Sequence, residues 1–335
     1  MNILLVSNHN PHFTNTVVYR ENALKKLGHQ VIFFEDRDFL IPGRIRQKNS
    51  FLQKWDLKRL NRKMVETARK TEPDLCLMVG GFRILKESLL ELKKMGVQTA
   101  IWTSDVPLDF TPVIETSPLY DHIFCAGTEA IEVLNKNGIH KAVWLPYACD
   151  PDYQKPIELT KKEKKQYSND LVFIGAFYPN RWDILKELED YNLRIWGPNW
   201  KMAVCADKKN IAVEDIKIDV KEWVKIYNAS KIALVIHYQD RKTPSFQASP
   251  KVYEALACKC FVLVDRQKDI FSIFEDGKHL VSFKNINDLK KKIDYFLNHS
   301  KERKKIASQG YQEVLKKHTY DHRIKKMFSV IHSQI

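Results

Sequence analysis

Residues 3–34 read ILLVSNHNPHFTNTVVYRENALKKLGHQVIFF, two short apolar runs on either side of a longer amphipathic stretch. The runs 3–6 and 31–34 have the composition of buried β-strands. Between them, residues 17–27 follow a helical pattern, and Gly28 is a common helix stop. This order predicts a β-α-β unit with parallel strands.

The same alternation continues through the first half of the chain. Further strands are expected at 75–79, 99–102, 123–125 and 142–145, with helices at 57–70, 86–95 and 129–137. Strands separated in this way by helices indicate a doubly wound parallel sheet, so residues 1–153 form the first Rossmann-like domain.

The pattern breaks after Pro151, where prolines and a run of charges at 161–165 replace the apolar periodicity. Residues 154–169 are therefore expected to be a linker. A second cycle follows, with strands at 171–174, 193–196, 232–236, 261–264 and 280–283 and helices at 182–188, 220–227 and 250–257. Residues 170–319 thus form a second α/β domain.

The tail, residues 320–335, is expected to be a helix that returns to the first domain. Its apolar residues Ile324, Met327, Phe328 and Ile331 have the spacing of one buried helical face. The fold class is therefore α/β, with two Rossmann-like domains facing each other across a cleft.

Composition limits the cellular setting and the partners. With 335 residues and 44% hydrophobic residues, the chain can fill two domains, and no apolar run reaches the roughly 20 residues of a transmembrane helix. Six scattered cysteines favour a reducing, cytoplasmic location. A net charge of +14 would attract nucleotides, nucleic acid, acidic glycans or another anionic surface.

The loop after the strand at 232–236 is the strongest candidate binding site. It begins at His237, and Ser249-Pro250 forms a helix start whose free N–H groups suit a diphosphate. Lys251 adds a positive charge, and Glu254 could accept hydrogen bonds from ribose hydroxyls. The alternative is an ordinary i, i+3 ion pair between Lys251 and Glu254.

The loop after residue 174, Gly175-Ala-Phe-Tyr178-Pro-Asn180-Arg181, is a second candidate phosphate-binding turn. Gly175 permits close backbone approach, Asn180 is expected to cap the next helix, and an arginine in a first turn favours a bound anion.

In the first domain, Asp105 follows a predicted strand and could act as a catalytic base or stabilise positive charge on a sugar; a simple turn residue is the alternative. His9 and His12 lie in the first strand-to-helix loop and could transfer protons. That loop lacks G-x-G-x-x-G, and no P-loop motif occurs, which disfavours a dehydrogenase or a P-loop NTPase. Asp36-Arg37-Asp38 is an isolated D-x-D match, so no metal site is expected.

Several segments together resemble the CgeB-like, spore-maturation-type glycosyltransferases, relatives of the group-1 GT-B enzymes. They lie in the family's order over residues 170–325, and a fainter likeness at 145–151 extends into the first domain. The segments are 172–181, Trp196-Gly-Pro198, 227–232, Lys251-Val-Tyr-Glu-Ala-Leu-Ala257, 261–265 and 318–323. The family often has arginine where Lys251 stands and glycine where Lys259 stands.

The resemblance implies transfer of a sugar from a nucleoside diphosphate, expected to be UDP, to an acceptor hydroxyl or amine. It implies no obligatory metal and no cofactor besides the nucleotide-sugar substrate. The donor-binding residues would be Gly175, Tyr178, Arg181, Gly197, His237, Ser249, Lys251 and Glu254, with Asp105 and His12 as catalytic candidates. Three alternatives stay open: a sugar-nucleotide epimerase, a non-catalytic nucleotide-sugar-binding protein, and a glycosyltransferase that acts on modified DNA.

Overall fold

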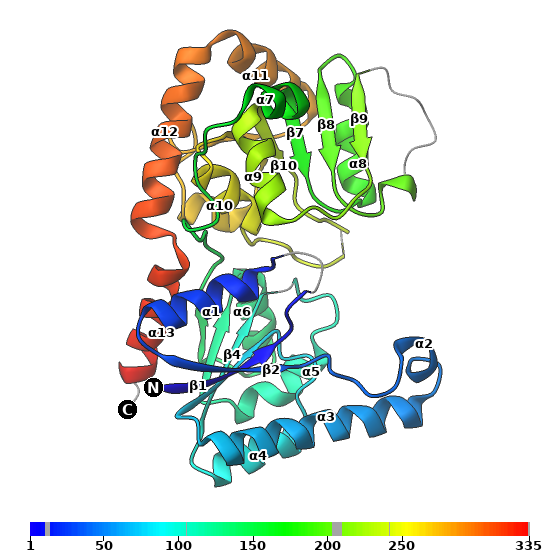
Figure 1. Ribbon diagram of the computed structural model, residues 1–335, viewed down its shortest axis with the longest axis vertical. Helices are drawn as coiled ribbons and strands as arrows, with labels where there is room; N and C mark the ends of the chain where they lie inside the picture. Colours follow the sequence, from blue (N-terminus) through cyan, green and yellow to red (C-terminus); the bar gives the residue numbers. More distant parts are fainter. Residues whose placement is uncertain (11–13, 105, 203–209, 241, 334–335) are drawn as a thin grey trace. The chain divides into compact units, whose positions relative to one another are not determined.

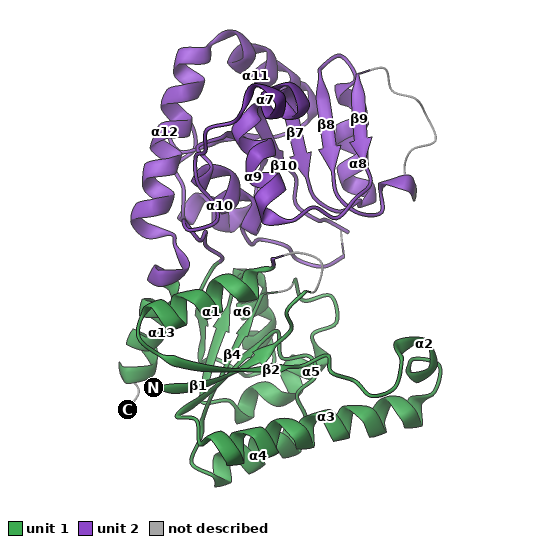
Figure 2. Ribbon diagram, viewed as in Figure 1, with its two compact units in different colours: residues 1–10, 15–146, 323–335 green, residues 11–14, 147–322 purple. Residues whose placement is uncertain are grey.

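The structure is a computed structural model that describes residues 1–10, 14–104, 106–202, 210–240 and 242–333. The chain divides into two compact units (Figure 2). Among the described residues, unit 1 comprises 1–10, 15–104, 106–146 and 323–333, and unit 2 comprises 14, 147–202, 210–240 and 242–322.

Unit 1 is built on a six-stranded parallel sheet with the strand order β2-β1-β3-β4-β5-β6 (Figure 1). Its strands are β1 (Asn2–Ser7), β2 (Gln30–Glu35), β3 (Leu75–Val79), β4 (Gln98–Thr103), β5 (His122–Cys125) and β6 (Ala142–Trp144). The central strands are buried on both faces, as their continuous apolar runs require.

The helices of unit 1 cover both faces of this sheet (Figure 1). They are α1 (Thr16–Lys26), α2 (Gly43–Arg46), α3 (Ser50–Thr71), α4 (Lys86–Lys94), α5 (Thr111–Thr116), the 3-10 turn η1 (Ser117–Leu119) and α6 (Thr128–Lys136). One apolar core joins the sheet to α3 and α4 through residues such as Met64, Met78, Leu92 and Ile101. Helix α3 begins earlier than predicted because Asn49 caps its first N–H groups.

The last helix, α13 (Tyr320–Ser333), returns to unit 1 as predicted. Ile324, Met327 and Ile331 are completely buried. The ring of Phe328 stacks on that of His29 at 4.4 Å. Burial of this apolar face is what holds the end of the chain in unit 1.

Unit 2 repeats the architecture, with the strand order β12-β11-β10-β7-β8-β9. Its strands are β7 (Asn169–Ile174), β8 (Leu193–Trp196), β9 (Ile211–Glu214), β10 (Ser230–Val235), β11 (Phe261–Asp265) and β12 (Val281–Phe283). Its helices are α7 (Lys161–Tyr167), α8 (Pro179–Leu185), η2 (Lys186–Leu188), η3 (Trp200–Met202), α9 (Val220–Ala229), α10 (Pro250–Ala257), η4 (Lys268–Ser272), α11 (Ile286–Asn298) and α12 (Ser300–Lys317).

All strand pairs in both sheets are parallel, which confirms the predicted α/β class. The segment expected to be a linker, 154–169, instead lies within unit 2 and carries α7. Thr160 and Glu163 form a capping box, which starts this helix despite its lack of an apolar face. The chain passes from unit 1 to unit 2 after residue 146 and back after residue 322, and Thr14, in the first strand-to-helix connection, is also grouped with unit 2. Within the described ranges, every helix is too short or too polar to span a bilayer.

Candidate functional site

The topology of unit 2 marks one position in its sheet. From β7 the chain adds β8 and β9 on one side, and it then returns to add β10, β11 and β12 on the other. The direction in which strands are added to the sheet therefore reverses between β7 and β10, although the strands stay parallel. In open α/β sheets, ligands bind beyond the carboxyl ends of the strands at such a point.

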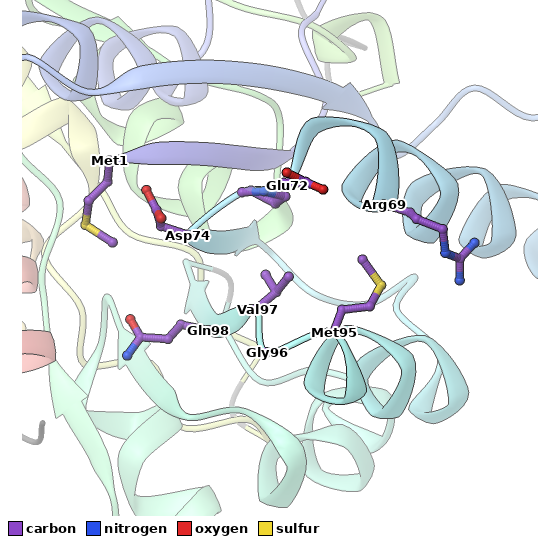
Figure 3. A pocket seen from close by; sticks show the side chains of 9 residues that line it. Met1, Arg69, Glu72, Asp74, Met95, Gly96, Val97 and Gln98 are labelled. Atoms are coloured by element: carbon purple, nitrogen blue, oxygen red, sulfur yellow. The ribbon is translucent and has the colours of Figure 1, made fainter.

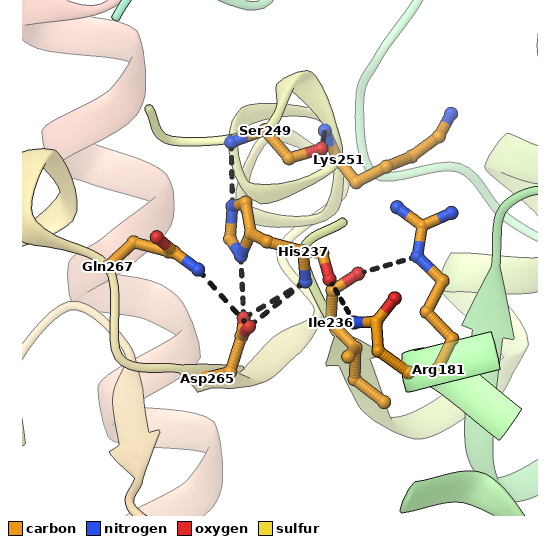
Figure 4. A network of polar contacts seen from close by, with 8 residues as sticks. Arg181, Ile236, His237, Ser249, Lys251, Asp265 and Gln267 are labelled. Carbon is orange, nitrogen blue, oxygen red and sulfur yellow. Dashed lines mark hydrogen bonds and ion pairs between the residues drawn. The ribbon is translucent and has the colours of Figure 1, made fainter. Parts of the chain in front are cut away.

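Arg181 connects the two strands at this position. Its Nε donates to the carbonyl of Ile236, after β10, at 2.9 Å, and its Nη1 donates to the carbonyl of Ala176, after β7, at 2.8 Å (Figure 4). Burial lowers the pKa of the guanidinium to about 10, so the group stays charged at neutral pH. Arg181 thus holds a positive charge at the reversal point.

Asn180 was predicted to cap α8, and this is wrong. The N-cap is Tyr178, because Pro179 takes the first helical position. Asn180 instead donates from Nδ2 to the carbonyl of His237 at 2.8 Å, a second link between the two loops. The ring of Tyr178 is partly exposed and packs on Tyr238, with 4.7 Å between the ring centroids.

Two glycines bring the loops after β7 and β8 together. Gly197 has a φ of +151°, and a Cβ at this position would lie 2.0 Å from the carbonyl oxygen of Gly175. The N–H of Gly175 donates to the carbonyl of Trp196 at 2.8 Å, and the indole of Trp200 donates to the carbonyl of Gly175 at 2.9 Å. Only glycine at 197 allows this close approach.

His237 ties the start of α10 to β11. Its Nε2 accepts the backbone N–H of Ser249 at 2.9 Å, and its Nδ1 lies 2.5 Å from Oδ1 of Asp265 (Figure 4). Since Nε2 accepts a hydrogen bond, the proton lies on Nδ1 and is donated to the carboxylate. Both ring nitrogens are engaged and the residue is buried, so His237 positions Ser249.

Helix α10 starts as predicted, with Ser249 as N-cap and Pro250 in the first turn. The expectation of free N–H groups there is wrong. The N–H of Ser249 donates to His237, that of Lys251 to Ser249 Oγ at 3.3 Å, and that of Val252 to the carbonyl of Ser249 at 3.0 Å. An anion at this helix start would therefore be bound mainly by side-chain charge.

Lys251 supplies that charge and is paired with Glu254. Its Nζ lies 2.7 Å from Oε2 of Glu254 and 5.0 Å from the ring centroid of Trp223 on α9. The ion pair given above as the alternative is therefore present. It differs from an ordinary surface pair because Glu254 is only 4% exposed.

Asp265 and Trp223 belong to the site but were not selected from the sequence. Asp265 ends a central strand, and a carboxylate at the carboxyl end of such a strand is a signal that could have identified it. Nothing local marks Trp223, because it reaches Lys251 only through the packing of α9 against the sheet.

The predicted catalytic residues Asp105 and His12 lie outside the described residues. His9 follows β1, and its Nε2 lies 2.8 Å from Oε2 of Glu21. Its ring stacks on that of Phe33, with 3.7 Å between the ring centroids. The carboxylates of the D-x-D match have separate cations, Arg83 for Asp36 and Lys63 for Asp38. No group of three or more His, Cys, Asp or Glu residues that could hold a metal occurs in the described part of the chain.

A hollow of about 810 Å³ in unit 1 lies at the edge of its sheet where the parallel strands begin (Figure 3). It is lined at the amino ends of β1, β3 and β4 by residues that include Met1, Asp74 and Gln98. Because ligands of such sheets bind at the carboxyl ends, this hollow is not the candidate site.

Sequence comparison finds proteins that this chain resembles. Residues 181–329 match a family described as glycosyl transferase-like. The chain is also 22% identical over 263 residues to the spore protein CgeB of Bacillus subtilis (strain 168), covering 75% of this chain and 80% of CgeB.

Solved structures share the fold of both units. Sucrose-phosphate synthase from Thermosynechococcus elongatus matches 99% of this chain and 98% of its own, with a TM-score of 0.72 and 12% identity. The Anabaena protein HepE, in complex with UDP, matches 99% of this chain and 100% of its own, with a TM-score of 0.68 and 12% identity. Residues 181–329 thus match a glycosyl transferase-like family, the chain is similar in sequence to CgeB, and its two parallel-sheet units have the GT-B fold of these solved structures.

Proposed function

We propose that this chain transfers a hexose-type sugar from a UDP-linked donor to an acceptor hydroxyl or amine. The donor would bind at the carboxyl edge of the sheet of unit 2. One observation carries the proposal: Arg181, Lys251 and a buried Glu254 lie after β7 and β10, the two strands between which the strand order reverses. HepE, which shares the fold, has been crystallised with UDP and with UDP-glucose.

Arg181 and Lys251 would stabilise the diphosphate. Negative charge develops on the diphosphate as the bond to the sugar breaks, and fixed cations beside it lower the barrier. Two guanidinium nitrogens of Arg181 already bind backbone carbonyls, which fixes the orientation of the third, Nη2. Gly175 and Gly197 would let the phosphates approach the bare backbone.

Glu254 would recognise the ribose. Its Oε2 accepts from Lys251, and its carboxylate can accept hydrogen bonds from two neighbouring hydroxyls. The flexible stem of Lys251 could then carry the ammonium to the diphosphate, so that the donor replaces the ion pair seen here. His237 and Asp265 would hold the start of α10 in place for both contacts.

The same proposal includes a reaction that needs neither a metal nor a cofactor, because the side-chain cations of Arg181 and Lys251 would neutralise the charge of the diphosphate. Activity should then be unchanged in EDTA. Asp105, with His12, remains our candidate for the catalytic group. A cytoplasmic location is part of the proposal and is supported by the buried thiols of Cys76, Cys125, Cys258 and Cys260, which form no disulfide.

Thermal shift with UDP and UDP-sugars tests the donor site, since a ligand that binds only the folded state raises the Tm. We expect a rise with UDP in the wild-type chain that is lost in Glu254→Gln. Glu275→Gln is the matched control, because Glu275 forms an i, i+3 pair with Lys278 on the surface. An unchanged rise in Glu254→Gln would refute the site.

Mass spectrometry of the sugar products tests the reaction. Transfer to an acceptor in a cell extract supports the proposal. Isomerisation of the donor without an acceptor would indicate the epimerase, and saturable binding without turnover would indicate the non-catalytic alternative.

A further inference from the structure

A cluster of exposed apolar side chains lies at one corner of unit 1. The α2–α3 corner, residues 40–55, contains Leu40, Ile45, Phe51 and Trp55, which are 45–72% exposed. Single exposed apolar residues are common, but four within sixteen positions are unusual. Figure 1 shows α2 and the start of α3 extending away from the sheet of unit 1.

The start of α3 takes no part in the core. The buried residues of this helix begin at Asp56, so Phe51 and Trp55, which share one helical face, have no packing partner in the core. The corner is nonetheless held in shape. The carboxylate of Asp56 accepts the N–H groups of Leu40 and Ile41 at 3.1 and 2.8 Å, and the guanidinium of Arg46 stacks 3.3 Å over Phe39.

The apolar cluster is surrounded by positive charge. From residue 40 to residue 63 the sequence has eight lysines and arginines and a single acid, Asp56. Arg44, Lys48, Lys54 and Lys58 are exposed, and none forms an ion pair among the residues that the structure describes. Their charge is therefore available to an external anion.

We propose that the α2–α3 corner docks on the surface of an anionic lipid bilayer. Phe51, Trp55, Ile45 and Leu40 would enter the region between headgroups and acyl chains, while the neighbouring cations bind the headgroups. A bilayer of this kind offers both an apolar phase and negative charge, whereas the backbone of a nucleic acid offers only the charge. This docking is independent of the proposed sugar transfer.

Co-sedimentation with vesicles tests the docking. We expect the wild-type chain to bind vesicles of equimolar phosphatidylcholine and phosphatidylserine, and to bind phosphatidylcholine vesicles at least about tenfold less tightly. Phe51→Ser/Trp55→Ser and Arg44→Gln/Lys48→Gln/Lys54→Gln should each reduce binding about tenfold or more. Added salt should weaken binding of the wild-type chain.

The control variants remove equivalent groups elsewhere. Leu90→Ser/Leu108→Ser removes two exposed apolar residues, and Lys301→Gln/Lys304→Gln/Lys305→Gln removes three exposed charges from α12. Circular dichroism would confirm that each variant is folded. Equal losses in corner and control variants, or no binding by the wild-type chain, would overturn the proposal.

Two further outcomes would also overturn it. Sedimentation velocity could show a dimer that Phe51→Ser/Trp55→Ser dissociates, which would assign the corner to a second copy of the chain. Binding of a DNA duplex that depends on the corner, without binding to vesicles, would assign it to nucleic acid.

Discussion

Replacing Lys251 with methionine removes its ammonium but keeps most of its stem. In the structure, Nζ lies 2.7 Å from Oε2 of Glu254, whose side chain is 6% exposed, while that of Lys251 is 29% exposed. The variant leaves a buried carboxylate without its cation. A hydrogen bond to a charged group contributes about 1.5–3 kcal/mol, and partial exposure of the lysine places the loss at the lower end, about 1.5–2 kcal/mol.

A double variant, Lys251→Met/Glu254→Gln, tests whether the two charges are coupled. It removes both charges, so the unfolding free energy should recover to within about 1 kcal/mol of the wild-type value. Urea unfolding followed by tryptophan fluorescence measures the unfolding free energy of the single and the double variant. The expected loss in Lys251→Met corresponds to a decrease in Tm of about 3–8 °C for a unit of this size. The control Lys278→Met breaks an exposed pair of the same spacing and should unfold like the wild-type chain.

The same variants separate stability from donor binding. Lys251→Met should bind UDP about 10- to 100-fold more weakly, because it loses a charge-assisted contact with the diphosphate. The double variant should recover stability but not affinity. Losses of stability that simply add in the double variant would show that the two charges are not coupled. Wild-type affinity in Lys251→Met would remove this residue from the diphosphate site.

Three further predictions concern the backbone and pH. Gly197→Ala should cost about 2–3 kcal/mol in urea unfolding, because its Cβ would lie 2.0 Å from the carbonyl oxygen of Gly175. Gly28→Ala, which has open space at a φ of +87°, should cost only about 1 kcal/mol, and equal losses would contradict the argument. Lys259→Gly should raise the unfolding free energy by up to about 1 kcal/mol, since Lys259 has a φ of +57°; destabilisation would mean that the contact of its ammonium with the Tyr311 ring matters more. Hydrogen bonds from Lys225 and Thr160 lower the pKa of Glu163 from its ordinary value of 4.5 to about 2, so its contribution to stability is full above pH 4.5 and is lost as the pH falls towards 2. Glu163→Gln should unfold with a smaller dependence on pH over that range, and identical pH profiles would refute the assignment.

Part of the site could be identified from the sequence because its signals are local. The helix start at Ser249-Pro250 and the spacing of Lys251 and Glu254 are visible in one short segment, and the structure has both. Position 259, where the resemblance led us to expect glycine, also has a local signal. This residue follows the end of α10 in a left-handed conformation, which glycine adopts without strain.

Other parts of the site depend on contacts between distant segments. From the sequence, Arg181 was a candidate for a diphosphate contact, but only the structure shows that it holds the loops after β7 and β10 together. The bond between His237 and Asp265 joins the ends of two neighbouring strands, and it explains why the N–H of Ser249 is already engaged. Local spacing gives no information about such pairs.

The sequence alone determined the α/β class, the two parallel-sheet units and the returning helix, because hydrophobic periodicity depends on near neighbours along the chain. Tertiary structure alone decided which polar groups meet at the reversal between β7 and β10, and that Glu254 is buried beside Lys251 and Trp223. The reason is physical: strand order and helix packing bring together residues that are far apart in the sequence, and burial then sets how strongly their charges interact.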